Sequence, residues 1–164
     1  MNKGFTLVEF LILVAILGIL AAVIVPEYQN HAQLAKESAA KDNLRILRNA
    51  IELYAAQHNG IPPGYPNGDT SQLPVMFLFV SQLQKATNIN HQIAAPGTAG
   101  FNLGPYVSEF PANPFNGKKS VVMVINDERR TPTGENGWLY DPQTRTIKLD
   151  WLGTDSRGQN YSDY

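Results

Sequence analysis

The sequence predicts an α+β protein in which a long N-terminal α-helix packs on a small C-terminal antiparallel β-sheet. Three observations support this fold class. The chain opens with an apolar run over residues 5–25, continues with an amphipathic helical pattern over 26–59, and carries three β-rich segments within 105–164. With 164 residues and 43% hydrophobic content, we expect one membrane segment and one modest globular domain.

The apolar run 5–25 is long enough to cross a bilayer, since a helix rises about 1.5 Å per residue and the hydrocarbon core is about 30 Å thick. Glu9 is the only charged residue in it. An ionised carboxylate at the centre of a membrane helix costs roughly 2.5–3.5 kcal/mol. Glu9 lies near the start of the run, where the membrane interface is close, but it still needs a partner.

Two ordinary interpretations of this run come first. A secretory signal peptide has an apolar core of roughly 7–15 residues followed by a cleavage site of small residues, and the core here is too long. A plain signal anchor, with Lys3 holding the N-terminus in the cytoplasm, explains the length. It leaves Glu9 unexplained.

The segment 26–59 has the spacing of an amphipathic helix. Its apolar positions in the second half are three, four and three residues apart: Leu44, Leu47, Ile51 and Tyr54. Asn59 and Gly60 are good helix terminators, and the two prolines that follow prevent continuation. A helix from residue 5 to about 58 would be about 80 Å long, far more than a small domain needs. The first half of this helix must therefore have a role other than packing within the globular domain.

The segment 60–104 reads as a variable loop that connects the helix to the sheet and contains one short helix. Val75, Phe79 and Leu83 are at near-helical spacing. Loops on a rigid scaffold commonly carry recognition. The alternative, which we favour, is that Met76, Phe77 and Phe79 close the core.

The region 105–164 reads as strands and turns. Its three β-rich segments are KKSVVMVIND, NGWLYD and RTIKLD, separated by TPTGEN and DPQT. This order predicts two successive hairpins and a three-stranded antiparallel sheet laid on the amphipathic half of the helix.

Residues with site chemistry are scarce. His31, His58 and His91 show no metal-ligand spacing and are expected to be solvated or to cap helices. There is no cysteine, no phosphate-binding loop and no GxSxG motif, so no catalytic residue is predicted. A formal net charge of −1 gives no strong nucleic-acid signal.

The opening MNKGFTLVEF resembles the start of type IV prepilins and type II secretion pseudopilins. Members of this family have a short basic leader ending in glycine, then a phenylalanine and, four residues later, a glutamate. Lys3, Gly4, Phe5 and Glu9 stand in those places here. The resemblance implies a type IV pilin-like fold, removal of leader 1–4 by cleavage between Gly4 and Phe5, and N-methylation of Phe5.

The resemblance also gives Glu9 a partner. In the family this acid pairs mainly with the N-terminal amine of the neighbouring subunit, so that a subunit at the wrong height leaves two charges buried without partners. Gly18 and Pro26 also match, and they imply a helix that bends or melts during assembly. The simpler alternative is that glycine and proline are common in membrane helices.

The function that the resemblance implies is a structural subunit of a helical filament, not an enzyme. Its partners would be further copies of the chain, prepilin peptidase, the inner-membrane assembly platform and minor pilins or pseudopilins. The precursor would cross the inner membrane once, with its N-terminus in the cytoplasm and its C-terminal domain in the periplasm, before joining a periplasmic or extracellular filament. The alternative is an anchored periplasmic binding module that never polymerises.

Two C-terminal stretches resemble the major pseudopilin of type II secretion more loosely. They are GPYVSEFPANPFNGK and the loop LGTDSRGQN. The resembling proteins bind Ca²⁺ in this region, and carboxylate oxygens suit that ion. This leaves two interpretations of Asp150, Asp155 and Asp163, a calcium loop or a solvated acidic tail, and we favour the tail because the full spacing of the calcium loop is absent.

Overall fold

The computed structural model describes residues 6–125 and 131–164, except for the side chains of residues 25, 26 and 29. The chain divides into two compact units, the N-terminal unit Met1–Glu37 and the C-terminal unit Ser38–Tyr164. Helix α1 (Leu7–Gln57) contributes residues to both units. The fold class is the predicted one, a long helix with an apolar first part and a small sheet.

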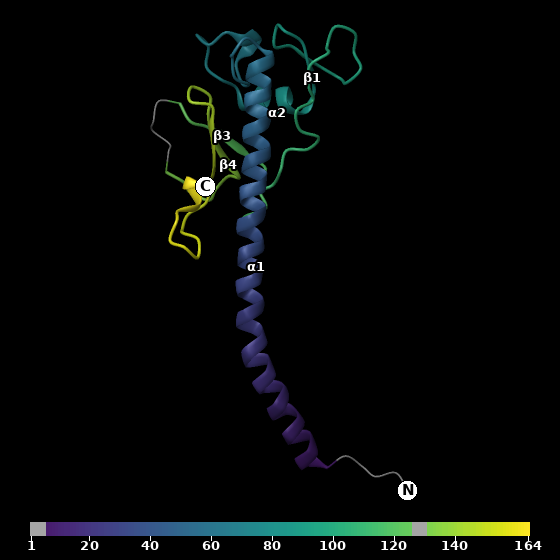
Figure 1. Cartoon of the computed structure of the whole chain (residues 1–164), viewed down its shortest axis with the longest axis vertical. Helices are drawn as coiled ribbons and strands as arrows, with labels where there is room; N and C mark the ends of the chain where they lie inside the picture. The colour runs from purple at the N-terminus through teal and green to yellow at the C-terminus, as the bar shows by residue number, and fades with distance from the viewer. Residues whose placement is uncertain (1–5, 126–130) are drawn as a thin grey trace. The chain divides into compact units, whose positions relative to one another are not determined.

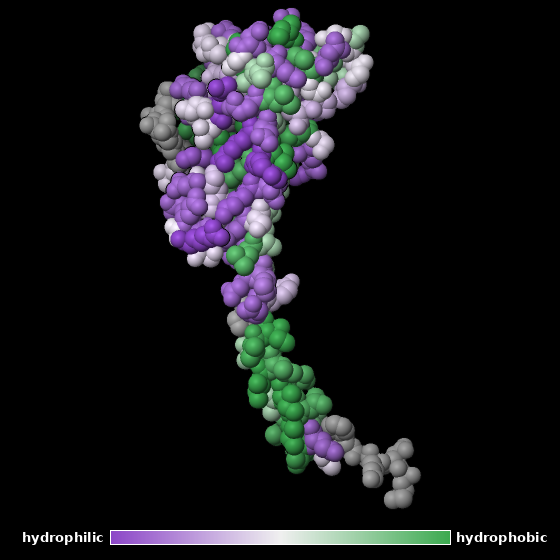
Figure 2. Space-filling view, viewed as in Figure 1, coloured by the Kyte–Doolittle hydropathy of each residue, from purple (hydrophilic) through white to green (hydrophobic). Residues whose placement is uncertain are grey.

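The N-terminal unit is helical in its described part, and its surface is apolar. The window Leu7–Ile24 has a mean hydropathy of 3.0, and none of it is buried within the chain. Figure 2 shows apolar side chains covering the visible face of this helix. The window is therefore long and apolar enough to cross a membrane, and no core of its own covers it.

The C-terminal unit has one hydrophobic core, and α1 supplies one wall of it. The predicted apolar stripe is buried, with Leu47, Ile51 and Tyr54 each 0% exposed. It packs with buried side chains of the strands, among them Trp138, Tyr140, Ile147 and Leu149. Figure 1 shows β3 (Val121–Met123) and β4 (Trp138–Asp141) beside this half of α1. The amphipathic helix and the sheet bury their apolar faces against each other, as the sequence predicts.

Helix α1 ends where the helix-terminating residues of the sequence predict. Its last residue is Gln57, and Asn59 and Gly60 follow with φ values of 56° and 83°. The Gly60 N–H donates to the carbonyl of Ala55 at 2.8 Å. This left-handed turn satisfies one of the free carbonyls at the helix end, and it suits glycine and asparagine.

The connection from α1 to the sheet contains a 3₁₀ turn, η1 (Pro66–Gly68), the helix α2 (Met76–Gln84) and a two-stranded antiparallel pair, β1 (Ala86–Thr87) and β2 (Ile93–Ala94). Phe79 is fully buried, and its ring stacks on Tyr140 with 4.1 Å between centroids. Met76 and Phe77 are 47% and 66% exposed. The expectation that all three residues close the core is therefore correct only for Phe79.

The main sheet has the order β3 (Val121–Met123), β4 (Trp138–Asp141), β5 (Thr146–Leu149). β4 and β5 form the predicted hairpin, with Trp138 opposite Leu149. Asp141 accepts N–H bonds from the turn between them, including that of Gln143 at 2.9 Å.

The first of the two predicted hairpins is not formed, because β3 runs parallel to β4. The chain enters β4 beside the residues that precede β3: the N–H groups of Gly137 and Trp138 both donate to the carbonyl of Ser120 at 3.0 Å. Gly137 has no room for a side chain, since a Cβ there would lie 2.2 Å from the Lys118 carbonyl oxygen. This close approach therefore requires a glycine immediately before β4.

Candidate functional site

Glu9 lies in the first turn of α1, and its carboxylate is held by Thr6. The Thr6 backbone N–H and hydroxyl donate to Glu9 Oε2 at 2.8 and 2.7 Å. In return, the Glu9 N–H donates to the Thr6 hydroxyl oxygen at 3.2 Å. This reciprocal arrangement is a capping box, which satisfies N–H groups that a helix start leaves free.

The capping box lowers the free-energy cost of placing Glu9 in an apolar segment. An unpaired polar group in hydrocarbon costs several kcal/mol, and a charge costs more. Here the carboxylate already accepts two hydrogen bonds from its own helix start. The predicted partner, a neighbouring subunit's amine, would thus be added to an acid that is already oriented. Gly4 and Phe5, the predicted cleavage and methylation residues, lie outside the described residues.

Gly18 and Pro26, the predicted points of bending, both lie within α1, which is helical across them. A Cβ added at Gly18 would meet no atom within 4 Å. Packing within the described chain therefore gives no reason for a glycine at this position. Bending or melting of the helix stays a prediction.

Asp150, the first of the three candidate calcium ligands, is buried and serves as an anchor for the loop before β4. Its carboxylate accepts the N–H groups of Thr133, Gly134 and Asn136, the last two at 3.0 and 2.8 Å. Burial alone would raise the pKa of Asp150, but these donors outweigh it, so the pKa lies below its usual value. The carboxylate is thus already engaged by backbone donors.

The carboxylates of Asp155 and Asp163 accept different donors, although Gln159 donates to Asp155 Oδ1 and to the Asp163 carbonyl oxygen. Asp155 is buried, whereas Asp163 is exposed in the turn η2 (Tyr161–Asp163), where it accepts from Asn160 Nδ2 at 3.0 Å. Within residues 6–125 and 131–164, no three histidine or acidic side chains are close enough together to hold a metal ion. The three aspartates are therefore not brought together as a calcium site would require. The favoured expectation of a solvated acidic tail holds only for Asp163, because Asp150 and Asp155 are buried among hydrogen-bond donors.

The three histidines have different environments. His31 is exposed, 3.1 Å from Glu27, as expected. His58 is fully buried, and its two ring nitrogens lie 2.8 Å from the Tyr54 carbonyl and 3.0 Å from the Asn88 carbonyl. It therefore has the expected capping role at the end of α1.

His91 is neither solvated nor at a helix end, so the expectation is wrong there. It is 5% exposed, and its Nδ1 lies 2.9 Å from the Tyr54 hydroxyl. Burial, and then the ring of His58, lower the pKa of His91 to about 4. The apolar core and the β1–β2 turn enclose the two rings, which sequence spacing alone could not show.

Sequence reasoning missed several residues that the structure makes prominent. Thr6 could have been found, because Thr-x-x-Glu at the start of an apolar helix is the capping-box signature. Lys41, Arg48 and Tyr164 had no local signal. These three meet across the C-terminal unit, with Lys41 Nζ 4.1 Å from the centre of the Tyr164 ring.

Comparison with known proteins shows that the N-terminal residues of this chain match a known family model. Residues 1–25 match the family model described as the prokaryotic N-terminal methylation motif. The match contains Gly4, Phe5, Thr6 and Glu9, and most of the exposed apolar helix. No solved structure gives a significant match to the chain.

Three relatives illustrate how far the similarity extends. The type II secretion system core protein G of Aeromonas hydrophila is 27% identical over 70% of this chain and 68% of its own length. The type IV major pilin protein PilE1 of Neisseria gonorrhoeae is 35% identical over 58% of this chain and 44% of its own. The fimbrial protein EcpB of Eikenella corrodens is 43% identical over 42% of each chain. The chain thus aligns with less than half the length of the latter two.

Proposed function

The chain belongs to the family of type IV pilins and type II secretion pseudopilins, and from this premise we propose that it is a structural subunit of a helical filament. The matched relatives are structural proteins by name, such as the major pilin PilE1 and the core protein G of type II secretion. The proposal covers the whole cycle of storage in the membrane, processing and polymerisation.

The observation that carries the proposal is the exposed apolar helix with one acid at its start. The window Leu7–Ile24 has no cover within the chain, and Glu9 is its only charged residue. Such a surface is stable in a bilayer, or packed against copies of itself, but not in water. A filament subunit needs both environments in turn.

Processing at the N-terminus is the first step that we propose. Prepilin peptidase removes residues 1–4 by cleavage between Gly4 and Phe5, and the new amine on Phe5 is methylated. The product keeps an ammonium beside the Thr6–Glu9 capping box, because an α-amino group has a pKa near 8. As each subunit docks, Glu9 pairs with the ammonium of its neighbour and thereby fixes the register.

Assembly then transfers the helix from lipid to the filament. We place the precursor in the inner membrane with the C-terminal unit in the periplasm, and name the assembly platform and minor pilins or pseudopilins as partners. Gly18 and Pro26 let the helix bend or melt as it repacks. Both a secretion pseudopilus and a surface pilus fit this cycle, and the relatives include proteins of both kinds.

The alternative is an anchored binding module that never polymerises. An anchor needs only the apolar length and a flanking positive charge. It has no use for a capped acid five residues after a leader glycine, so the family match makes this alternative the weaker one.

Two substitutions at Glu9 test the proposal. Glu9→Ala removes both the charge and the two hydrogen bonds that the carboxylate accepts from Thr6, whereas Glu9→Gln keeps an oxygen that accepts from Thr6 and removes only the charge. We expect both precursors to insert and to be cleaved, since losing a charge favours insertion. Filaments imaged by electron microscopy should be absent or rare for both.

The pair of variants separates the two roles of Glu9. Normal filaments from Glu9→Gln, with none from Glu9→Ala, would mean that the cap alone matters and that charge pairing does not set the register. Normal filaments from both variants would remove the register argument. A third variant, Gly4→Glu, should block cleavage and leave Phe5 unmethylated, and its efficient processing would argue for a different peptidase.

A further inference from the structure

The C-terminal loop, residues 150–164, is folded around the carboxylate of Asp155. Oδ1 accepts the N–H groups of Arg157 and Gln159 at 2.8 and 2.9 Å. The Asp155 N–H in turn donates to the Gln159 carbonyl at 2.8 Å, which closes the turn. The Asp155 side chain is only 2% exposed. A carboxylate buried to this extent needs positive charge or several donors nearby.

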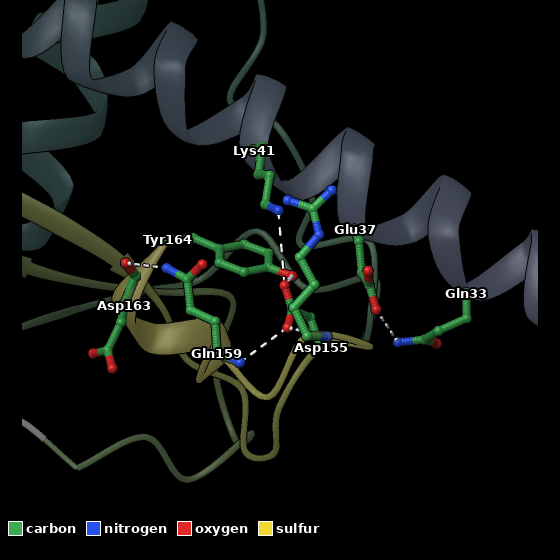
Figure 3. Close-up of polar contacts among 8 residues, drawn as sticks. Gln33, Glu37, Lys41, Asp155, Gln159, Asp163 and Tyr164 are labelled. Atoms are coloured by element: carbon green, nitrogen blue, oxygen red, sulfur yellow. Dashed lines mark hydrogen bonds and ion pairs between the residues drawn. The ribbon is translucent and has the colours of Figure 1, made fainter.

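The second carboxylate oxygen faces α1 and Tyr164. The Tyr164 hydroxyl donates to Oδ2 at 3.0 Å, and Lys41 Nζ lies 3.9 Å from the same atom. Figure 3 shows the Lys41 amine and the Tyr164 hydroxyl converging on Asp155. Lys41 contributes a positive charge to this cluster, and it comes from α1, not from the loop itself.

Tyr164 is held by α1 at more than one point. The Lys41 ammonium lies 4.1 Å from the centre of its ring, a cation–π contact. Arg48 donates to the Tyr164 carbonyl oxygen, and also to that of Ile147 at 3.3 Å. Lys41 and Arg48 are seven residues apart, two helical turns on one face of α1. The helix thus holds the loop through two cations.

These residues do not fit a calcium ion. Calcium takes six to eight oxygen ligands, several of them carboxylates. Both Asp155 oxygens already accept N–H or O–H donors, and a lysine ammonium beside them would repel a divalent cation. Asp150 is engaged by the 133–136 loop, and Asp163 lies in a separate turn. Binding a metal would require the contacts of all three carboxylates to be rebuilt.

We propose that Lys41 is the built-in counter-cation of the C-terminal loop, which therefore folds onto α1 without a divalent ion. Lys41 positions the loop through Asp155 and Tyr164, and the loop completes the C-terminal unit. This proposal concerns the fold of a single chain, so it can fail or hold whether or not the chain polymerises.

The test uses the full chain in detergent micelles, with tryptophan fluorescence as the reporter of thermal unfolding. Both tryptophans, Trp138 and Trp151, belong to the C-terminal unit. We expect the same unfolding midpoint in saturating CaCl₂ and in EGTA, and no binding heat when CaCl₂ is titrated into the chain. A midpoint that rises in calcium and returns in EGTA would overturn the proposal.

Substitutions at Lys41 test the counter-cation directly. Lys41→Met keeps the aliphatic stem and removes the charge, and we expect its midpoint to fall by roughly 3–5 °C. Lys41→Arg should recover most of the loss. Lys36→Met, which removes an exposed lysine on the same helix, should leave the midpoint unchanged. A Lys41→Met midpoint equal to that of the unaltered chain would contradict the proposal.

A smaller change covers the case in which Lys41→Met does not fold. Tyr164→Phe removes only the hydroxyl that donates to Asp155. Hydrogen exchange should then become faster at the N–H groups of Arg157 and Gln159, with the core amides unchanged. Unchanged exchange at these two groups would show that the cluster does not hold the loop.

Discussion

The two units of the chain use apolar residues in opposite ways. In the C-terminal unit the large apolar side chains of α1 and the strands are buried in one core, with Leu47, Trp138 and Ile147 each 0% exposed. In the N-terminal unit the apolar window Leu7–Ile24 is entirely uncovered. This difference indicates that the C-terminal unit is stabilised by contacts within the chain. The N-terminal unit needs lipid or other copies of itself.

The acids of the two units differ in the same way. Glu9 is satisfied by Thr6, three residues away in the sequence. Asp155 is satisfied by its own turn and by Lys41 and Tyr164, which come from other parts of the C-terminal unit. Local capping suits a helix that must change its surroundings, since it does not depend on any particular neighbour.

The largest expected effect comes from making the same substitution in both units. Leu47→Ala deletes a fully buried side chain and should destabilise the C-terminal unit by about 2–5 kcal/mol. Leu17→Ala changes a side chain that is 56% exposed and should leave the unfolding of that unit unchanged. Thermal unfolding of the full chain in micelles measures both. Equal losses would contradict the division into two kinds of unit.

A pH dependence confined to the C-terminal unit is the next prediction. His91 has a pKa of about 4 in the fold and 6.5 when unfolded, so the fold favours its neutral form. Stability from this group is therefore fully present above pH 6.5 and is lost as the pH falls toward 4. A difference of about 2.5 units corresponds to at most about 3 kcal/mol.

His91→Asn tests this pH dependence, since asparagine also adopts the positive φ of 63° found at this position. The groups that face the ring are His58, 4.8 Å away between ring centroids, and the Tyr54 hydroxyl. Unfolding midpoints measured from pH 7 to pH 4 should fall less steeply for the variant. Parallel curves would assign the acid sensitivity to other groups.

A smaller effect should follow from weakening the capping box. Thr6→Val removes the hydroxyl and should cost about 1 kcal/mol at the start of α1, whereas Thr6→Ser should cost little. Hydrogen exchange at the Glu9 N–H, which donates to that hydroxyl, measures the change in micelles. The C-terminal unit serves as the internal control, and its exchange rates should not move. No acceleration at Glu9 in Thr6→Val would mean that the box is not formed in the membrane.

The smallest effect concerns Gly18. Gly18→Ala should stabilise the helix by up to about 1 kcal/mol, because alanine has the higher helix propensity and a Cβ meets open space there. Slower amide exchange around residue 18 would show it. If the helix must melt during assembly, the same variant should also form fewer filaments. Unaltered filaments would leave the glycine without that role.

The sequence was most informative where periodicity and composition decide the structure. The run 5–25, the stripe Leu44–Leu47–Ile51–Tyr54 and the β4–β5 hairpin all follow from patterns within a few turns of chain. The parallel pairing of β3 with β4 did not follow, because it is accompanied by contacts between distant segments, such as those of Asp150 with the loop before β4 and of Gly137 with Lys118. Such contacts join distant segments and leave no periodic signal.

The candidate sites also differ in whether a local motif or only distant contacts reveal them. Glu9 and the predicted cleavage residues, Gly4 and Phe5, are identified by a short motif, and the capping box could have been predicted from Thr6 and Glu9 as well. The acidic residues of the C-terminal loop look alike in sequence, yet the carboxylates of Asp150, Asp155 and Asp163 accept different donors. Only the fold shows that a lysine from α1 lies beside Asp155.

The most direct test of the central claim is mass spectrometry of the N-terminal peptide from the chain recovered in isolated filaments. A filament subunit of this family should yield a peptide that begins at N-methylated Phe5 and contains intact Glu9. A chain that never enters filaments, or one that keeps Met1 or is cut beyond Ala22, would contradict the account.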